Sequence, residues 1–511
     1  SLGLINVKDA PYLAVGDGVT NDTAAIQAAK AAAEDLGGTL FFPAGTYSIQ
    51  SNVTMPSNLR VAFSTGAVWA VATGVTVTLS YPDQVIAGQR QKIFQLAGTG
   101  KVQFVGTSAS SNAAYFLGTV YPQWWGALGD DDHDDTAAIQ AAMDCAPDPT
   151  NGGLSRGITV YFPWGNYRFG ALDVPGRTIL RGEEQRSSML RRIPGSTGTA
   201  IEDKGHAIGI HIIALDIRCN DCVGDAVQLG VTSNTYSPGG VNQWGHNGML
   251  DRVRVSDANG YALYLHVNGN TIRNIQTTAC QGSLITGIAT HILGWHDSSY
   301  VPGTETSTPF GLKLEGQNHR VVGFHGEGIY STAAIYVAAT GTSILAADCT
   351  VGSGRTLPAV VYIGTNRNDA MLYGIGAYAY QGSPDGVISA LVVDDSYTSR
   401  RIVPGYWGAA GNERTQYLGV YYAGRNRNDI RNTGTTYVPS TGKWLRGDRV
   451  LVESSAGFPL EMVCTTAGEP GTWSPVGVVP GAVAKTGDYS VATSDNGKRF
   501  DNTGATGTIT F

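Results

Sequence analysis

The chain has 511 residues and a net charge of −7. This length exceeds the roughly 250–300 residues at which a single compact core stops growing, so several domains or an elongated repeat are expected. With 68 glycines and only 15% charged residues, the sequence is turn-rich and weakly charged. It contains no long basic run of the kind that binds nucleic acid and no stretch of ~18 apolar residues, so we expect neither nucleic-acid binding nor membrane insertion.

An octapeptide, DTAAIQAA, occurs at residues 22–29 and again at residues 135–142. Asp22 and Asp135 are placed to cap the N-termini of two helices, because a short carboxylate accepts hydrogen bonds from free backbone N–H groups. In each copy an isoleucine and an alanine three residues apart form an apolar face. The aromatic segments TLFFPAGTYSI and ITVYFPWGNYRF then predict strands. Each copy therefore reads as a glycine-rich loop, a capped helix and a strand.

Two further features could suggest a metal site, but neither completes a ligand set. Cys219 and Cys222 form a CxxC motif without a second pair or a nearby histidine. Five aspartates lie between residues 130 and 135, but they lack the alternating ligand pattern of a calcium-binding loop. We expect thiols in the core, a loop with a helix cap, and no metal or cofactor.

From about residue 205 the sequence repeats short β-rich segments in which apolar and polar residues alternate, as in strands buried on one face. Stacking these segments predicts an inward column of apolar residues and three outward columns of mainly polar ones. The inward column contains Leu215, Val253, Ile275 and Phe324. The outward columns contain Asp216, Arg254, Gln276 and His325; Arg218, Ser256, Thr278 and Glu327; and Gln228, Tyr264 and Tyr336.

The GDG and DTAAIQAA motifs, followed by FFPAGTY, resemble those of the pectate-lyase-like superfamily of right-handed parallel β-helices. This resemblance implies an all-β fold: a right-handed parallel β-helix with a short capping α-helix, preceded by a small head domain and followed by small β modules. The expected domains are residues 1–122 for the head, 123–402 for the main β-helix, 403–478 for a small β module and 479–511 for a C-terminal β segment.

The linking segment GTVYPQWWGA and the segments LEGQN and HGEG are similar to those of bacteriophage tailspike depolymerases. This similarity implies a homotrimer in the virion tail, attached to the tail or baseplate through its N-terminal region and acting extracellularly. Its expected partner is a bacterial surface polysaccharide, either capsule or O-antigen. No cofactor is expected for cleavage of such a polymer.

Hydrolysis of the glycosidic bond is the first expectation, because one carboxylic acid can protonate the leaving oxygen while a second carboxylate activates water or attacks carbon. Glu327 and Glu315 are the expected catalytic residues, with Asp216 in reserve. Ion pairs are the competing interpretation, between Glu315 and either Lys313 or Arg320, and between Asp216 and Arg254. The expected substrate-binding residues are His325, Arg254, Tyr264 and Tyr336.

Two other functions remain open from the sequence. In the first, the chain is a polysaccharide lyase that performs β-elimination on a uronic-acid polymer. Tyr264, His266 or His325 would then remove the proton, and Arg254 would neutralise the carboxylate. In the second, the chain is a receptor-binding spike that holds the polysaccharide without cutting it.

Overall fold

The computed structural model describes residues 3–107, 116–146, 157–203, 209–230, 245–300, 307–352, 355–364 and 370–379, and only short segments beyond these. Most elements are β-strands, and two α-helices occur in the described part of the chain. Neither of those helices has the length and apolar character of a membrane span. The chain divides into two units, residues 1–329 and 330–511. The modules expected at 403–478 and 479–511 lie largely outside the described residues.

The first hundred residues form three short sheets, and all of their strand pairs are parallel. Parallel pairing between successive short strands is the pattern of a stacked coil, so the head region repeats the architecture of the region that follows it. The sheets contain β1 (Leu4–Asn6), β3 (Thr39–Phe42), β6 (Arg60–Phe63) and β9 (Val85–Ile86); β2 (Asp17–Asn21), β4 (Gly45–Ile49), β7 (Ala67–Val71) and β10 (Phe94–Leu96); and β5 (Val53–Thr54), β8 (Thr76–Leu79) and β11 (Lys101–Phe104).

The two copies of DTAAIQAA form α1 (Thr23–Asp35) and α2 (Thr136–Met143), as predicted. Asp22 and Asp135 occupy the N-cap positions, but their carboxylates do not accept the predicted hydrogen bonds from the backbone N–H groups of the helices. The Asp135 carboxylate instead accepts hydrogen bonds from the backbone N–H groups of Leu128 and Gly129. Asp22 accepts the equivalent bonds from Val15 and Gly16. These aspartates therefore fasten the glycine loop to the helix start.

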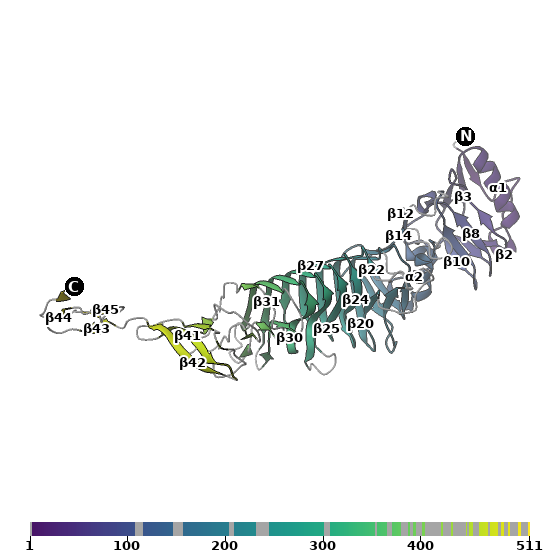
Figure 1. The fold of residues 1–511 in the computed structure, drawn as a ribbon. Coiled ribbons are helices and arrows are strands. Elements are labelled where there is room, and N and C mark those ends of the chain that lie inside the picture. Colours follow the sequence, from purple (N-terminus) through teal and green to yellow (C-terminus); the bar gives the residue numbers. More distant parts are fainter. Residues whose placement is uncertain are drawn as a thin grey trace, which may run out of the picture. The chain divides into compact units, whose positions relative to one another are not determined.

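From residue 116 onward, the first unit contains two long parallel sheets (Figure 1). One sheet contains, in pairing order, β12 (Phe116–Val120), β14 (Gly157–Phe162), β17 (Thr178–Gly182), β20 (His211–Cys222), β23 (Met249–Ala258), β25 (Thr271–Cys280), β27 (His291–Ser298) and β29 (Arg320–Gly326). Joined to it are β13 (Asp130–Asp134), β15 (Gly165–Phe169) and β18 (Ser188–Arg192). The other contains β16 (Leu172–Val174), β19 (Ile201–Asp203), β21 (Val227–Leu229), β24 (Leu263–Asn268), β26 (Ser283–Ile288) and β28 (Thr308–Gln317).

The interior column of the longer sheet confirms most of the predicted register. Leu215 pairs with Val253, and Val253 pairs with Ile275, so these three side chains stack inside the coils. The prediction then omitted one coil, because Trp295 of β27 lies between Ile275 and Phe324. All five side chains are at most 2% exposed. Burial of such large apolar side chains stabilises each coil against its neighbours.

Gly287 and Gly316 lie on adjacent strands of the shorter sheet, where their backbones approach closely. A Cβ atom added to Gly316 would lie 2.0 Å from the carbonyl oxygen of Gly287, and Gly316 also has a φ of +98°. We therefore expect Gly316→Ala to lower the free energy of unfolding by about 1–3 kcal/mol, through overpacking and backbone strain. The shift of a denaturation midpoint measures this effect. Gly195→Ala is the matched control, since Gly195 also has positive φ but has open space around it; equal losses in both variants would contradict the steric explanation.

The second unit is also mainly parallel where it is described, except for the antiparallel pairs β40–β41 and β41–β42. The parallel strands are β30 (Tyr330–Thr340), β33 (Val361–Ile363), β36 (Val392–Asp394) and β38 (Tyr421–Tyr422); β31 (Ser343–Val351), β34 (Met371–Ala379) and β37 (Arg401–Val403); and β32 (Thr356–Leu357) and β35 (Val387–Ile388). Further along lie β39 (Arg431–Asn432), β40 (Arg449–Val452), β41 (Pro459–Thr466) and β42 (Thr472–Val478), and the pairs β43 (Ala482–Ala484) with β45 (Arg499–Asp501) and β44 (Tyr489–Ser490) with β46 (Ile509–Thr510).

The cysteines follow the expectation of core thiols. All six are free and buried, including both members of the CxxC motif. Burial raises the pKa of the Cys219 thiol to about 12. At neutral pH this side chain is therefore a thiol rather than a thiolate, and it is a poor metal ligand.

Candidate functional site

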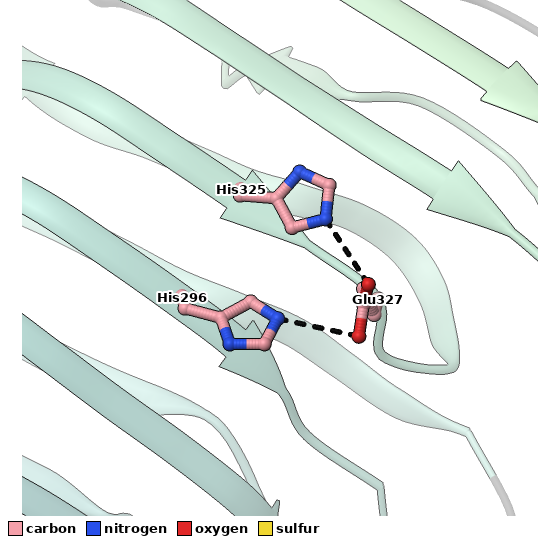
Figure 2. Close-up of side chains that lie close together, drawn as sticks. All are labelled: His296, His325 and Glu327. Atoms are coloured by element: carbon pink, nitrogen blue, oxygen red, sulfur yellow. Dashed lines mark hydrogen bonds and ion pairs between the residues drawn. The ribbon is translucent and has the colours of Figure 1, made fainter.

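Two histidines and a glutamate converge on the outer surface of the longer sheet (Figure 2). His296 of β27 pairs with His325 of β29 in the strand register, so the two imidazoles lie on adjacent coils. Their ring centroids are 5.3 Å apart and their planes differ by 28°. Nε2 of His325 lies 3.2 Å from Oε1 of Glu327, and Nε2 of His296 lies 3.2 Å from Oε2 of the same carboxylate. One carboxylate therefore bridges two stacked imidazoles.

The backbone explains why Glu327 reaches both rings. Glu327 follows the last residue of β29, and its N–H donates a hydrogen bond of 2.7 Å to the carbonyl oxygen of Asp297. Asp297 directly follows His296 in β27, so this bond fastens the start of the turn beside the preceding coil. The glutamate side chain therefore projects between the two histidines rather than into open solvent.

The interior behind the histidines is also polar and fully buried. The Asp297 carboxylate accepts hydrogen bonds from the hydroxyl groups of Thr277 and Ser299. Nε1 of Trp295 donates a bond of 3.2 Å to the Thr277 hydroxyl. Trp295 and Asp297 flank His296 on the strand, and both are held from inside the coil. This network limits the orientations open to the backbone that carries His296.

The bridging carboxylate is ionised in the neutral range. Partial burial acts to raise the pKa of Glu327, but hydrogen bonds and ion pairs with His325 and His296 outweigh it and hold the pKa below its usual value. A carboxyl group with a lowered pKa is a weak proton donor, so Glu327 fits the role of a base or an orienting anion. The imidazoles are the other groups in the cluster that can donate a proton.

Other predicted site residues share the outward column with the histidines. Asp216 pairs with Arg254, Arg254 with Gln276, and Gln276 with His296, in successive coils. The column therefore presents a guanidinium, an amide and two imidazoles in order along the stack. Such a row has donors suited to the carboxylates and hydroxyls of an extended acidic glycan.

Asp216 occupies the predicted outward register position, paired with Arg254, but its side chain is not accessible to a substrate. Its side chain is fully buried, and Oδ2 lies 3.2 Å from a guanidinium nitrogen of Arg218 and 3.3 Å from one of Arg254. The ion pair that competed with a catalytic role is therefore present, and it involves two arginines. Because its carboxylate is out of reach of solvent, Asp216 is a structural residue that holds the arginines in place.

Glu315 and Glu327 are not brought together. Glu315 lies on β28 of the shorter sheet, and Oε1 of its carboxylate is 2.6 Å from Nζ of Lys313, the ion pair that the sequence left as an alternative. Glu327 follows β29 of the longer sheet, whose seven residues span about 20 Å at ~3.3 Å per residue. The catalytic pair expected for hydrolysis needs carboxyl groups about 5–10 Å apart.

The aromatic residues predicted to bind substrate lie elsewhere. Tyr264 pairs with Gln228 in the shorter sheet, as predicted, and its ring meets that of Tyr261 edge to face. Burial raises the pKa of Tyr264, which disfavours the phenolate form that a base would need. Tyr336 belongs to the second unit, where its ring stacks on Tyr362 with centroids 5.0 Å apart.

His266, the remaining candidate base, lies on β24, and its Nδ1 is 2.5 Å from the hydroxyl of Thr286. Burial lowers the pKa of His266. Of the residues considered as bases, His325 has a carboxylate partner in Glu327, at 3.2 Å.

His296 was missed in the sequence, although a signal for it was present. Residues 294–296 read GWH and residues 323–325 read GFH. Both glycines have positive φ, and the aromatic residues pair with each other, as do the histidines. A search for short repeated triplets between coils would have aligned the two imidazoles.

The fold and the repeated motif agree with a family model. Residues 4–67 and 124–240 match the model described as Rhamnogalacturonase A/epimerase, pectate lyase-like. These segments contain the two copies of DTAAIQAA. Together with the long parallel sheets, they define the class of the fold as a parallel β-helix. Over these two segments the chain is similar to the pectate-lyase-like β-helix superfamily.

Individual relatives match shorter parts of the chain. Mannuronan C5-epimerase AlgE3 of Azotobacter vinelandii is 30% identical over 196 residues, which are 35% of this chain and 10% of that protein. Alginate lyase 7 of the same organism is 30% identical over 159 residues, 28% of this chain and 17% of that protein. The chain thus spans less than a third of the length of these curated relatives.

A solved structure of tailspike protein 2 from the Escherichia coli O157:H7 bacteriophage CAB120 is 13% identical. The match covers 69% of this chain and 52% of that one, with a TM-score of 0.36. Similarity at that level adds nothing to the fold already described.

Proposed function

We propose that this chain is a polysaccharide lyase that cleaves a uronic-acid polymer by β-elimination, with His296, His325 and Glu327 as its acid–base group. The supporting observation is the pair of stacked imidazoles held by one carboxylate on an outward column. β-Elimination is one of the functions that the sequence leaves open beside hydrolysis. It is now preferred to hydrolysis because the two predicted catalytic carboxylates lie on different sheets, and the reserve carboxylate is buried.

The proposed step uses one neutral imidazole and one imidazolium. The neutral ring removes the proton from the carbon next to the uronate carboxylate, while the imidazolium protonates the leaving glycosidic oxygen. The C–O bond breaks, a C=C bond forms, and the two protons balance. Glu327 stabilises whichever ring is charged.

The column on either side of the histidines suits an acidic sugar. Gln276 lies one coil from His296, and Arg254 lies two coils away, at coil spacings of ~4.8 Å. Amide and guanidinium N–H groups bind carboxylates and would reduce the negative charge that opposes proton removal. Because both imidazoles lie on one protein face, they approach one face of the bound sugar, which favours elimination over inversion at the carbon.

The setting proposed for this activity is a phage tail. On the resemblance of its motifs, the chain would form a homotrimer, attach to the tail or baseplate through residues 1–122, and act extracellularly on host capsule or O-antigen through residues 123–402. Residues 403–478 and 479–511 would form the small β modules that follow.

The type of product tests the function. Incubation with polymannuronate and with uronic-acid capsule polysaccharides is expected to yield new reducing ends together with ultraviolet absorbance from the new C=C bond. His291→Gln is the matched control for substitutions of His296 and His325, because His291 is an exposed histidine at the start of β27. Reducing ends without absorbance would indicate hydrolysis, inversion without chain cleavage would indicate epimerisation, and binding without any product would indicate a receptor-binding spike; each result would overturn the proposal.

A further inference from the structure

We infer that His296, His325 and Glu327 also form a binding site for a divalent transition-metal ion of the Zn²⁺ type. One ligand atom from each residue lies within 4.8 Å of the others. All three come from two adjacent strands and the turn after the second, so the backbone register brings them together. The site departs from the sequence-based expectation that no metal binds.

The spacing of the donor atoms agrees with tetrahedral coordination. Each imidazole Nε2 lies 3.2 Å from an oxygen of the Glu327 carboxylate. Metal–ligand bonds of ~2.0–2.1 Å at tetrahedral angles separate two ligands by about 3.3 Å. An ion placed between the carboxylate and the rings can therefore replace two hydrogen bonds with three coordinate bonds after small rotations of the side chains.

The donor types determine which ion fits. Two imidazoles and one carboxylate are the ligands of catalytic zinc sites and of other first-row divalent ions, whereas Ca²⁺ and Mg²⁺ prefer sets of oxygen ligands. The side chains of His296, His325 and Glu327 are 43%, 29% and 46% exposed. Solvent therefore reaches the site, and water or a sugar oxygen can take the remaining coordination position.

The geometry of the cluster suits a single cation. The two imidazoles have ring centroids 5.3 Å apart, and both lie beside one carboxylate. A divalent ion bound between them places its charge next to that carboxylate. The exposed pair of His133 and Asp130 offers only one imidazole and is the natural comparison.

Metal binding would regulate the proposed reaction, and this part of the inference rests on the proposed function. An imidazole coordinated through Nε2 carries its one proton on Nδ1, so the neutral ring has no free lone pair with which to accept a proton. Zn²⁺ is therefore expected to inhibit elimination, and a chelator is expected to preserve it. Binding itself does not depend on the activity and can be measured without substrate.

The experiment titrates chelator-treated protein with Co²⁺, followed by its visible absorption, and with Zn²⁺ by calorimetry. The wild-type protein is expected to bind one more equivalent of metal ion than each of the variants His296→Gln, His325→Gln and Glu327→Gln. In these variants the affinity at that site should fall at least about 100-fold, since each loses one of three ligands.

His291→Gln and His133→Gln are the controls and should bind like wild type. Ca²⁺ and Mg²⁺ should neither bind at this site nor inhibit. Unchanged binding in all three ligand variants, or no binding by wild type, would overturn the metal site. If the metal binds as described but elimination requires it, the metal site stands and the proposed imidazole chemistry fails.

Discussion

Replacing Glu327 with glutamine is expected to lower kcat on a uronic-acid polysaccharide by about 10³-fold, within the range that acid–base groups contribute. Glutamine keeps the size of the side chain but loses the charge that stabilises an imidazolium at 3.2 Å. The measurement is the initial rate of appearance of ultraviolet absorbance in the presence of a chelator. Because the substitution lies on the exposed side of a turn, the denaturation midpoint should change little.

Glu315→Gln separates this account from hydrolysis by two glutamates. Glu315 has an exposed ion pair with Lys313, and such pairs contribute about 0–1 kcal/mol, so we expect a change in rate of a few-fold at most. A loss in Glu315→Gln as large as that in Glu327→Gln would contradict the assignment of the acid–base group to the histidine cluster.

Asp216→Asn is expected to lower the free energy of unfolding by about 3 kcal/mol, near the lower end for breaking a buried ion pair. The substitution leaves Arg218 and Arg254 without the carboxylate that both contact. The value is at the lower end because the arginines are 35% and 20% exposed and keep some contact with water. Equilibrium denaturation, followed by tryptophan fluorescence, measures the loss.

Glu184→Gln is the matched control for burial. Glu184 also contacts an arginine, Arg252, at 3.3 Å, but its side chain is 56% exposed. Its loss should cost no more than about 1 kcal/mol. Equal losses in the free energy of unfolding for the two substitutions would contradict the claim that burial makes the Asp216 ion pair more important for stability.

The repetitive parts of the fold were predictable because they depend on local pattern. The two octapeptides specify α1 and α2 through apolar spacing and a loop before each helix, and both helices form where expected. The alternation of apolar residues placed Leu215, Val253 and Ile275 in one interior column, since a period of two assigns each residue to a face.

The site was harder to predict because it depends on which coils are neighbours. The segment with Trp295 was left out, so Gln276 was placed next to His325 when His296 lies between them. Coil length varies along the chain: β25, β27 and β29 begin at residues 271, 291 and 320. No fixed period reveals the missing strand.

The alternation of apolar and polar residues also did not predict that a side chain in an outward column could be buried. Asp216 occupies the same column as His296 and His325, which are half-exposed, yet it is fully buried against Arg218 and Arg254. Alternation predicts the direction of a side chain from the sheet but not which long neighbours cover it. The outward position of Asp216 therefore did not make it available to a substrate.

A crystal structure of Glu327→Gln with a bound uronic-acid oligosaccharide tests the central claim most directly. The account predicts sugar residues along the column from Arg254 to His325, with a ring nitrogen of His296 or His325 about 3–3.5 Å from the carbon that bears the uronate carboxylate. An oligosaccharide bound beside Tyr264 and Lys313 of the shorter sheet, away from both imidazoles, would contradict it.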